Sequence, residues 1–519
     1  MVTKTSNPSA TVRMYRGFLG DCFLLKFFGA GRPSYVLIDC GILQGTSGAS
    51  ELTGRIMADI AKTTDNHLDV LVATHEHWDH ISGFHDTSEN FSKIRVDELW
   101  LGWTEDERDE QAMRLRAVRA KRQHALKQSF SALQELLAPP PPPKHDDDDD
   151  EPAGTALGPV ATPMVGIEGL MAFAGVDPSF AVAGVTTGEI LKCLKAKAGR
   201  VRYWSPGAPA FAMPGLPDSR VYVLGPPRDE ILLRRSDPKK HSGEVYELGG
   251  GEDEAESFFA SAIPDDASPS SDDLASLQFN LPFGPKPLFL TVKGTSKWLG
   301  RESKESGSLQ WFQDNYVNQE KWRQIETDWF GAAEQLALKM DSDTNNTTLA
   351  LAIELNAGGP VLLFPGDAQV GNWLSWGDYV WPPGARREDR NTVTIEDLLA
   401  RTVLYKVGHH GSHNATLRER GLELMTHRDL VAMIPVDQEF ANDKKHWNMP
   451  FPSLLGRIDA KTGGRVIRAD RDRTHLVDAS NQRAGKLGQL TQAEWDRFLD
   501  AVRDIKDADG LIAIEYDIC

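Results

Sequence analysis

The sequence predicts an α/β protein whose strands are buried within sheets. Apolar strand candidates alternate with a helical segment in the first 104 residues, and a second series of strand candidates begins at residue 347. Continuous apolar runs among them indicate strands that other elements cover on both faces. The chain has 519 residues, 40% of them hydrophobic and 25% charged, which is sufficient for a large globular core.

The N-terminal part is expected to open with short strands. Strand candidates occupy residues 11–17, 22–28 and 35–39, and each is bounded by glycine or proline. Residues 51–62 place apolar side chains at helical spacing, and residues 68–74 form a continuous apolar strand. This order of strand, helix and strand is typical of an α/β sheet.

Two long polar segments interrupt the pattern. Residues 105–137 have the composition of a long charged helix or helix pair, which the five prolines at 139–143 end. An acidic run follows the prolines, so residues 139–152 are predicted to form an extended linker. Residues 236–320 are rich in Gly, Ser, Asp and Glu and are predicted to form a second insertion.

Strand candidates return around the second insertion, together with a helix-like segment at 320–340. They occupy residues 201–204, 220–224, 347–355, 361–364, 403–407 and 430–435. The predicted organisation is a core in three pieces with two insertions and a C-terminal extension: 1–104 the N-terminal half of the core, 105–200 a helical insertion with the linker 139–152, 201–235 core strands, 236–320 a polar insertion, 321–480 the C-terminal half of the core, and 481–519 a C-terminal helix and strand.

Composition and charge limit the function classes. The formal net charge of −18 opposes a broad electrostatic grip on nucleic acid, although a local basic groove remains compatible with it. The first thirteen residues contain no apolar signal region, and no apolar run approaches the roughly 18 residues of a membrane span. The four cysteines lack paired spacing. We therefore expect a cytoplasmic protein with reduced thiols and no membrane partner.

The strongest chemical signal follows the apolar strand 68–74. It is the turn His75-Glu76-His77-Trp78-Asp79-His80, in which four potential metal ligands lie within six residues. Imidazole nitrogens suit zinc, manganese or iron, and Asp79 adds negative charge. A short turn can direct alternate side chains to two neighbouring ions, so this pattern predicts a metal site.

This turn, preceded by the strand that ends in Ile38-Asp39-Cys40-Gly41, resembles the metallo-β-lactamase superfamily. The resemblance implies an αββα sandwich, here with two large insertions. It assigns His75 and His77 to one metal and Asp79 and His80 to the other. It also gives Asp39 a supporting role beneath the turn, where an acid fixes the tautomers of the ligands.

Two later segments resemble the soluble hydrolase domain of ComEC-type competence proteins: Leu362-Leu363-Phe364-Pro365-Gly366-Asp367 and Leu404-Tyr405-Lys406-Val407-Gly408-His409-His410-Gly411-Ser412. In the superfamily, the aspartate after such a strand bridges both metals, which the resemblance assigns to Asp367. The late histidine that completes the second site is His409 or His410. Ser412 either contacts a substrate phosphate or caps a following helix.

One departure concerns the third histidine that most superfamily members place before the strand preceding the bridging aspartate. This chain has Asn345-Asn346 there, as ComEC-type sequences do. The departure predicts that an oxygen, from the amide of Asn346 or from water, replaces an imidazole, with Asn345 in a supporting position. An oxygen donor makes the site harder, so manganese becomes a candidate beside zinc.

The resemblance implies a hydrolase with two divalent ions, zinc or manganese, that share a hydroxide. The residues expected to act in catalysis are Asp79, Asp367 and His410. The expected activity is that of a phosphodiesterase or nuclease on nucleic acid or nucleotides. The alternatives are a lactonase or thioesterase on the same fold and a non-catalytic metal-binding interaction protein, in which the two insertions contact a protein partner.

Overall fold

The computed structural model describes residues 9–29, 31–85, 89–137, 172, 185–236, 238, 244–245, 339–382, 392–445, 447–482 and 490–518. The chain divides into two units, of which the first comprises Met1–Gln123, Val165–Leu248 and Leu338–Cys519. The second comprises His124–Met164 and Gly249–Ala337. The predicted linker 139–152 and nearly all of the predicted insertion 236–320 and helix 320–340 lie outside the described residues. The fold below is that of the first unit.

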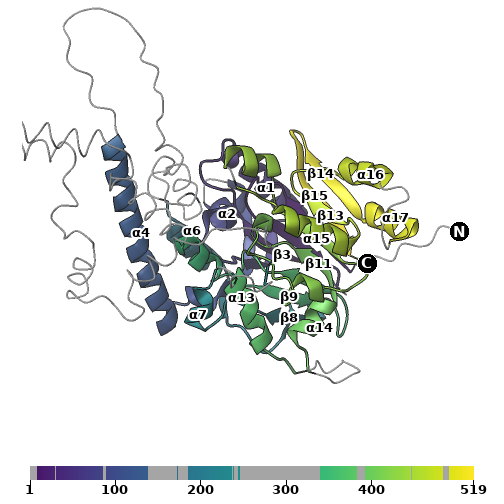
Figure 1. Ribbon diagram of the computed structural model, residues 1–519, viewed down its shortest axis with the longest axis horizontal. Coiled ribbons are helices and arrows are strands. Elements are labelled where there is room, and N and C mark those ends of the chain that lie inside the picture. Colours follow the sequence, from purple (N-terminus) through teal and green to yellow (C-terminus); the bar gives the residue numbers. More distant parts are fainter. Residues whose placement is uncertain are drawn as a thin grey trace, which may run out of the picture. The chain divides into compact units, whose positions relative to one another are not determined.

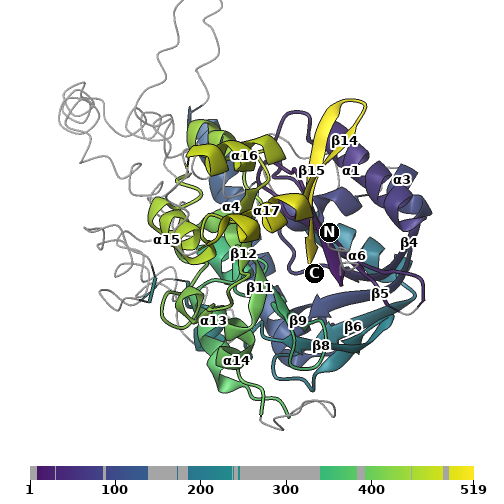
Figure 2. The ribbon, with the colours of Figure 1, turned by 90° about the vertical axis from the view of Figure 1, so that its right-hand side faces the viewer.

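Among the described residues, eight strands form the first sheet (Figures 1 and 2). Their order is β14 (Val502–Asp507), β15 (Gly510–Ile518), β1 (Ala10–Tyr15), β2 (Cys22–Phe27), β3 (Ser34–Cys40), β4 (His67–Val72), β5 (Arg95–Gly102) and β6 (Arg200–Trp204). Neighbours are antiparallel from β14 to β3 and parallel from β3 to β6. The predicted N-terminal strands are therefore present, and β5 adds one that the sequence pattern did not reveal.

The second sheet has seven strands within the described part of the chain. Their order is β13 (Val466–Arg468), β12 (Val431–Ile434), β11 (Thr402–Lys406), β10 (Val361–Phe364), β9 (Leu351–Glu354), β8 (Leu216–Val223) and β7 (Phe211–Met213). Neighbours are parallel from β13 to β10 and antiparallel from β10 to β7. The predicted strand 347–355 is shorter than expected, because residues 348–350 lie outside any strand.

The two sheets pack face to face around a shared apolar core. In β3, Val36 and Ile38 belong to this core, whereas Leu37 belongs to the cluster on the opposite face of the sheet. This follows from the two-residue period of a strand, which sends successive side chains to opposite faces. Across the interface, the rings of Phe23 and Phe364 lie 5.7 Å apart edge to face. Strands that are apolar on both faces thus match the continuous apolar runs in the sequence.

Helices cover the outer face of each sheet. On the first sheet they are α1 (Ala49–Thr64), α3 (Glu89–Lys93) and α6 (Thr187–Lys197). On the second sheet they are α13 (Val370–Ser375), α14 (Ile395–Ala400) and α15 (Pro452–Thr462). Figure 2 shows α1 and α3 on one side of the two sheets and α13, α14 and α15 on the other. The predicted αββα sandwich is confirmed.

The remaining helices lie at the borders of the predicted domains. The predicted helix 105–137 is α4 (Glu110–Leu137), which starts later because Asp109 accepts a hydrogen bond from the backbone N–H of Ala112 and acts as its cap. At the C-terminus, α16 (Arg473–Gln482) and α17 (Gln492–Ala501) precede the hairpin β14–β15, where one strand was predicted. No helix in the described part of the chain is long and apolar enough to span a bilayer.

Candidate metal centre

The predicted ligands lie at the carboxyl ends of strands from both sheets. Asp39 belongs to the end of β3, and the turn 75–80, which includes the short helix α2 (Trp78–Ile81), follows β4. In the second sheet, Asp367 follows β10, and His409 and His410 follow β11. β3 and β4 are parallel neighbours, as are β10 and β11, so the loops of each pair leave the same sheet edge.

Asp39 fixes the orientation of the turn that carries the histidines. Its carboxylate accepts hydrogen bonds from the backbone N–H of Thr74 (2.8 Å), the hydroxyl of Thr74 (2.7 Å) and Nδ1–H of His80 (2.8 Å). Asp39 is fully buried, and its φ of 55° places it in the left-handed region. The strain of that conformation is offset by these bonds, which leave Nε2 of His80 available to face the centre.

The same network determines the tautomer of His75. Because the single hydroxyl proton of Thr74 goes to Asp39, the 3.1 Å contact between Thr74 Oγ1 and His75 Nδ1 requires Nδ1–H of His75 as the donor. The other ring nitrogen, Nε2 of His75, is buried and has no hydrogen-bond partner. An unpartnered imidazole lone pair inside a protein is what a metal ligand presents before the ion binds.

Four ligand-type side chains converge from the two sheets at one point. Asp79 Oδ2 lies 3.2 Å from His410 Nε2 and 3.5 Å from His80 Nε2, and His80 Nε2 lies 3.0 Å from Asp367 Oδ2. Ligands bound tetrahedrally at zinc distances stand roughly 3.3–3.6 Å apart. The cluster therefore has the spacing of a metal site, and its residues fit a divalent ion.

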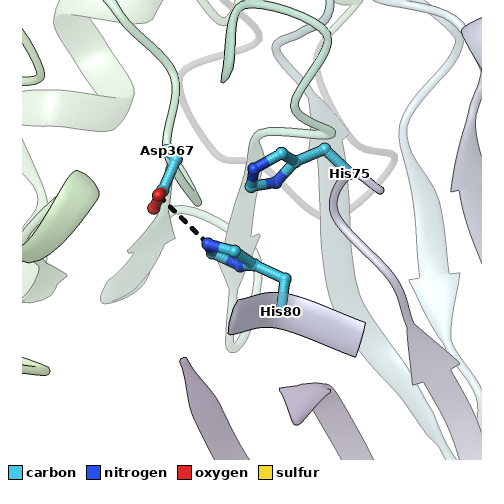
Figure 3. Close-up of side chains that lie close together, drawn as sticks. All are labelled: His75, His80 and Asp367. Atoms are coloured by element: carbon cyan, nitrogen blue, oxygen red, sulfur yellow. Dashed lines mark hydrogen bonds and ion pairs between the residues drawn. The ribbon is translucent and has the colours of Figure 1, made fainter. Parts of the chain in front are cut away.

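Asp367 belongs to two such groups. One consists of Asp79, Asp367 and His410, and the other of His75, His80 and Asp367, and the ligand atoms of each group lie within 4.8 Å of one another. Figure 3 shows His75 and His80, from one half of the chain, and Asp367, from the other, pointing toward a common space. A carboxylate shared by two ligand groups is the arrangement expected of a bridging residue.

The structure distinguishes between the two late histidines. His410 donates Nδ1–H to the carbonyl of Pro435 (2.7 Å), which leaves Nε2 to face Asp79. The backbone N–H of His409 donates to Asp367 Oδ1 (3.1 Å), and its ring contacts the hydroxyl of Ser412 (3.1 Å). His410 thus joins the ligand group, whereas His409 lies beside it. Neither His409 nor His77 belongs to a ligand group of three or more among the described residues.

Burial and charge separate the histidines into two classes. Burial lowers the pKa of His77 and of His409 to about 4 and the pKa of His75 well below its usual value, so these rings are neutral. Burial also opposes a charge on His80 and on His410, but the surrounding carboxylates outweigh it and raise the pKa of both rings. Without an ion, protons occupy the positions nearest the carboxylates, and a metal competes for them.

Two charged residues at the centre were not anticipated from the sequence. Lys406 is 1% exposed and donates to Asp21, to the carbonyl of Gly366 (2.9 Å) and to Asp367 Oδ1 (3.3 Å). Asp21 is 2% exposed, and its Oδ1 has no hydrogen-bond partner. The sequence could have indicated Lys406, because a charged residue is unusual within an otherwise apolar strand. Nothing in the sequence marks Asp21 as a site residue except its place in a short Gly-Asp step between two strands.

The cluster contains more acidic groups than cations. Its buried charged residues are five carboxyl groups and one ammonium: Asp21, Asp39, Asp79, Asp341, Asp367 and Lys406. Burial raises the pKa of Asp21 and of Asp341, so these two carboxyl groups take up a proton more readily than the ordinary acid does. Divalent cations bound here would offset the charge of the ionised carboxylates, which is costly inside a protein.

The asparagine pair differs from the sequence prediction. Nδ2 of Asn346 donates to the carbonyl of Arg235 (2.8 Å), and Oδ1 accepts from the backbone N–H groups of Gln369 and Asn372 (3.2 Å each). Both ends of this amide are therefore engaged with backbone groups, and Asn346 is a structural residue rather than the expected ligand. Asn345 donates from Nδ2 to Asp341 Oδ2 (3.1 Å), which agrees with a supporting position.

Ser412 does not cap a helix, and its contact with a substrate phosphate stays a prediction. Its hydroxyl donates to Asn414 Oδ1 (3.0 Å) and contacts Nδ1 of His409. Residues 413–421 form turns and bends rather than a helix, so the capping interpretation is wrong. Since the hydroxyl proton goes to Asn414, the bond to His409 requires Nδ1–H of the ring as donor, and Ser412 orients His409 beside the centre.

Two glycines permit the loops to approach this closely. A Cβ on Gly41 would stand 2.2 Å from the backbone carbon of Asp79, and a Cβ on Gly366 would stand 2.3 Å from Thr348 Cγ2. Gly366 also has a φ of 57°. A larger residue at either position would displace a ligand-bearing loop.

Fold and site together define an αββα sandwich with a buried cluster of histidines and aspartates that can hold divalent metal ions. The family model of the metallo-beta-lactamase superfamily matches residues 15–170 of the chain. The matched segment contains Asp39 and the turn 75–80, whereas Asp367 and His410 lie beyond it and join the site through the fold. No curated protein matches the chain.

Proposed function

We propose that the chain is a metal-dependent hydrolase that cleaves phosphodiesters in nucleic acids or nucleotides. The observation that carries this proposal is the convergence of two ligand groups on Asp367, with ligand spacings suited to metal ions. A retired or purely structural site has no physical need for so many buried ligands and for one carboxylate shared between two groups. Zinc and manganese are the expected ions.

The chemistry divides between the ions and the protein. Bound divalent ions supply an activated water at neutral pH and polarise the scissile group. The protein holds His75, His80 and His410 with Nε2 directed inward, through Thr74, Asp39 and Pro435 respectively. It also shields this cluster from bulk solvent, which strengthens electrostatic stabilisation of a charged transition state.

The substrate class is supported by the likeness of residues 362–367 and 404–412 to the hydrolase domain of ComEC-type proteins. These two segments are neighbours in space, since β10 and β11 pair in parallel and deliver Asp367 and His410 to one edge. The net charge of −18 opposes a broad electrostatic grip on nucleic acid, so binding of such a substrate would depend on contacts close to the bound ions.

The test combines metal analysis with a substrate panel. Purified protein is assayed for bound metals and for hydrolysis of single-stranded DNA, duplex DNA, a cyclic dinucleotide, bis(p-nitrophenyl) phosphate, a lactone and a thioester. We expect two ions per chain and turnover of phosphodiesters that a chelator removes. Asp367→Ala should lower metal content and reduce turnover by at least about a hundredfold, because Asp367 belongs to both ligand groups.

Each alternative has its own outcome in this panel. Turnover of only the lactone or the thioester would replace the phosphodiesterase assignment with that class of hydrolase. Bound metal without turnover of any substrate would favour a metal-binding interaction protein. Wild-type turnover in Asp367→Ala would show that Asp367 does not bridge the ions.

A further inference from the structure

The first ion lacks the third histidine that most members of the superfamily provide. The family resemblance places His75 and His77 on that ion, and it provides no third histidine, since Asn345-Asn346 stands in its place. The structure removes Asn346 from consideration, because both ends of its amide are engaged with backbone groups. His77 also lies outside the compact ligand groups that contain His75.

Asp341 is the acid that faces His77. Its Oδ1 lies 3.8 Å from Nε2 of His77, a separation that one ion between two ligands spans at bond lengths of roughly 2.0–2.2 Å. Asp341 is 9% exposed, and Oδ1 has no hydrogen-bond partner. The ring of His77 lies 4.7 Å from the ring of His75, whose Nε2 is also buried and without a hydrogen-bond partner.

The helical segment 339–345 directs Asp341 toward the centre. Asn345 lies one turn further along and donates to Asp341 Oδ2, so it holds the carboxylate with Oδ1 directed at His77. Asp343, two residues away and therefore on another face, pairs instead with Arg122 (2.8 Å) and Lys339 (3.0 Å). Of these two neighbouring acids, only Asp341 has an oxygen aimed at a candidate ligand.

We propose that Asp341 is a further protein ligand of the ion held by His75, His77 and the bridging Asp367, and that it replaces the histidine typical of the superfamily. This inference rests on the proposed metal-dependent function. A carboxylate contributes a hard, negatively charged donor where the family has a neutral imidazole. The first site therefore accepts manganese more readily than an all-imidazole site.

The experiment measures metal binding directly. Metal-free wild type and the variants Asp341→Asn, Asp341→His and Asp343→Asn are titrated with zinc and with manganese by calorimetry, and bound metal is counted after desalting. Asp341→Asn keeps the shape of the side chain and removes its charge. Asp341→His restores the imidazole typical of the superfamily, and Asp343→Asn is the matched control on the same helical segment.

We expect wild type and Asp343→Asn to bind two ions. Asp341→Asn should retain one ion, and its affinity for the second should fall at least about tenfold. Asp341→His should recover the second zinc ion and lose affinity for manganese. If Asp341→Asn fails to fold, Asp341→His decides the question alone, since unchanged manganese affinity in that variant would overturn the proposal.

Two other results also overturn it, and they are distinguishable. If wild type binds two ions and Asp341→Asn binds both with unchanged affinity, Asp341 is not a ligand while the proposed function stands. If wild type binds no divalent ion, the proposed function fails and this inference fails with it.

Discussion

Asp39 shows how one buried acid can prepare two ligands at once. It binds His80 directly and His75 through Thr74, so a single carboxylate determines which ring nitrogen each histidine presents. The family resemblance predicted this role, and the structure has Asp39 at the end of β3, beside the parallel strand β4 that precedes the turn. Of the four ligand-type residues in the turn, His75, Asp79 and His80 belong to the ligand groups, whereas His77 does not.

Other site residues carried no comparable signal. Asp341 stands in the polar run Asp341-Ser342-Asp343-Thr344, and nothing in the linear order distinguishes it from Asp343. Only the packing of the segment directs one acid inward and leaves the other with Arg122 and Lys339. Asn346 was predicted as a ligand because it stands where the superfamily has a histidine. In the structure its amide forms hydrogen bonds with backbone groups instead, and the sequence pattern does not reveal those bonds.

Lys406 provides a residue-scale test of the charge balance. Replacing it by methionine leaves Asp21 and Asp367 without their buried cation. We expect Lys406→Met to lower the free energy of unfolding of metal-free protein by about 3–5 kcal/mol, the usual cost of breaking a buried pair. Urea denaturation in the presence of a chelator measures this change.

The control for this variant is Lys339→Met. The ammonium of Lys339 pairs with Asp343, but the side chain of Lys339 is 41% exposed. Exposed pairs are worth less than about 1 kcal/mol, so Lys339→Met should unfold nearly as wild type does. Equal losses in the two variants would mean that Lys406 does not compensate the buried carboxylates.

At the scale of elements, ion pairs join α4 to the turn 75–80 and to the segment that carries Asp341. Arg119 pairs with Glu76, which lies between His75 and His77, and Arg122 pairs with Asp343 beside Asp341. Glu105 is 6% exposed. Burial and, to a smaller extent, the charge of Glu76 raise the pKa of Glu105, whereas the charge of Arg119 lowers it. The first turns of the predicted insertion thus support the site.

The sequence predicted α4 as a helix but not this contact. A run rich in Arg, Lys and Glu is typical of an exposed helix, and the pattern does not show which arginine meets a buried acid. The C-terminal hairpin is a similar case. β15 pairs with β1 along the full length of β1, and such pairing depends on contacts between residues some 500 positions apart, which no local pattern contains.

Arg119 provides the test at this scale. We expect Arg119→Met to lower the free energy of unfolding by about 3 kcal/mol, because it leaves the largely buried Glu76 without its partner. Loosening of the turn should also weaken metal binding by about tenfold, as removal of supporting partners of ligands commonly does. Urea denaturation and calorimetric metal titration measure the two effects.

Arg114→Met is the matched control on the same helix, since Arg114 is 64% exposed and pairs with a half-exposed Glu230. It should change stability by less than about 1 kcal/mol and leave metal affinity as it is. An Arg119→Met variant that behaves like this control would show that α4 does not support the turn.

At the scale of the whole molecule, the site is assembled from the beginning and the end of the chain. Every candidate ligand lies in the unit formed by Met1–Gln123, Val165–Leu248 and Leu338–Cys519. The family match ends at residue 170, before Asp367 and His410, so the N-terminal segment alone lacks half of the ligand set. The core strands at both ends of the chain were predictable from their apolar runs, and their pairing into one site followed only from the family resemblance.

The predicted linker 139–152 provides a test at this scale. We expect a chain in which residues 139–151 are replaced by a short Gly/Ser linker to bind two ions and to keep turnover within about twofold of wild type. The reason is that this proline-rich and acidic run is too polar to contribute to a core, and the candidate ligand groups found among the described residues do not need it. Metal content and turnover on bis(p-nitrophenyl) phosphate, each compared with the full chain and with Asp367→Ala, measure the result. If the shortened chain lost an ion while remaining folded, the run would belong to the metal centre, and the division of the chain into a catalytic core and insertions would be wrong. If the shortened chain kept both ions and lost only the turnover of DNA, the run would contribute to the binding of long substrates and not to the chemical step. An insertion that supplies no metal ligand can still have that role.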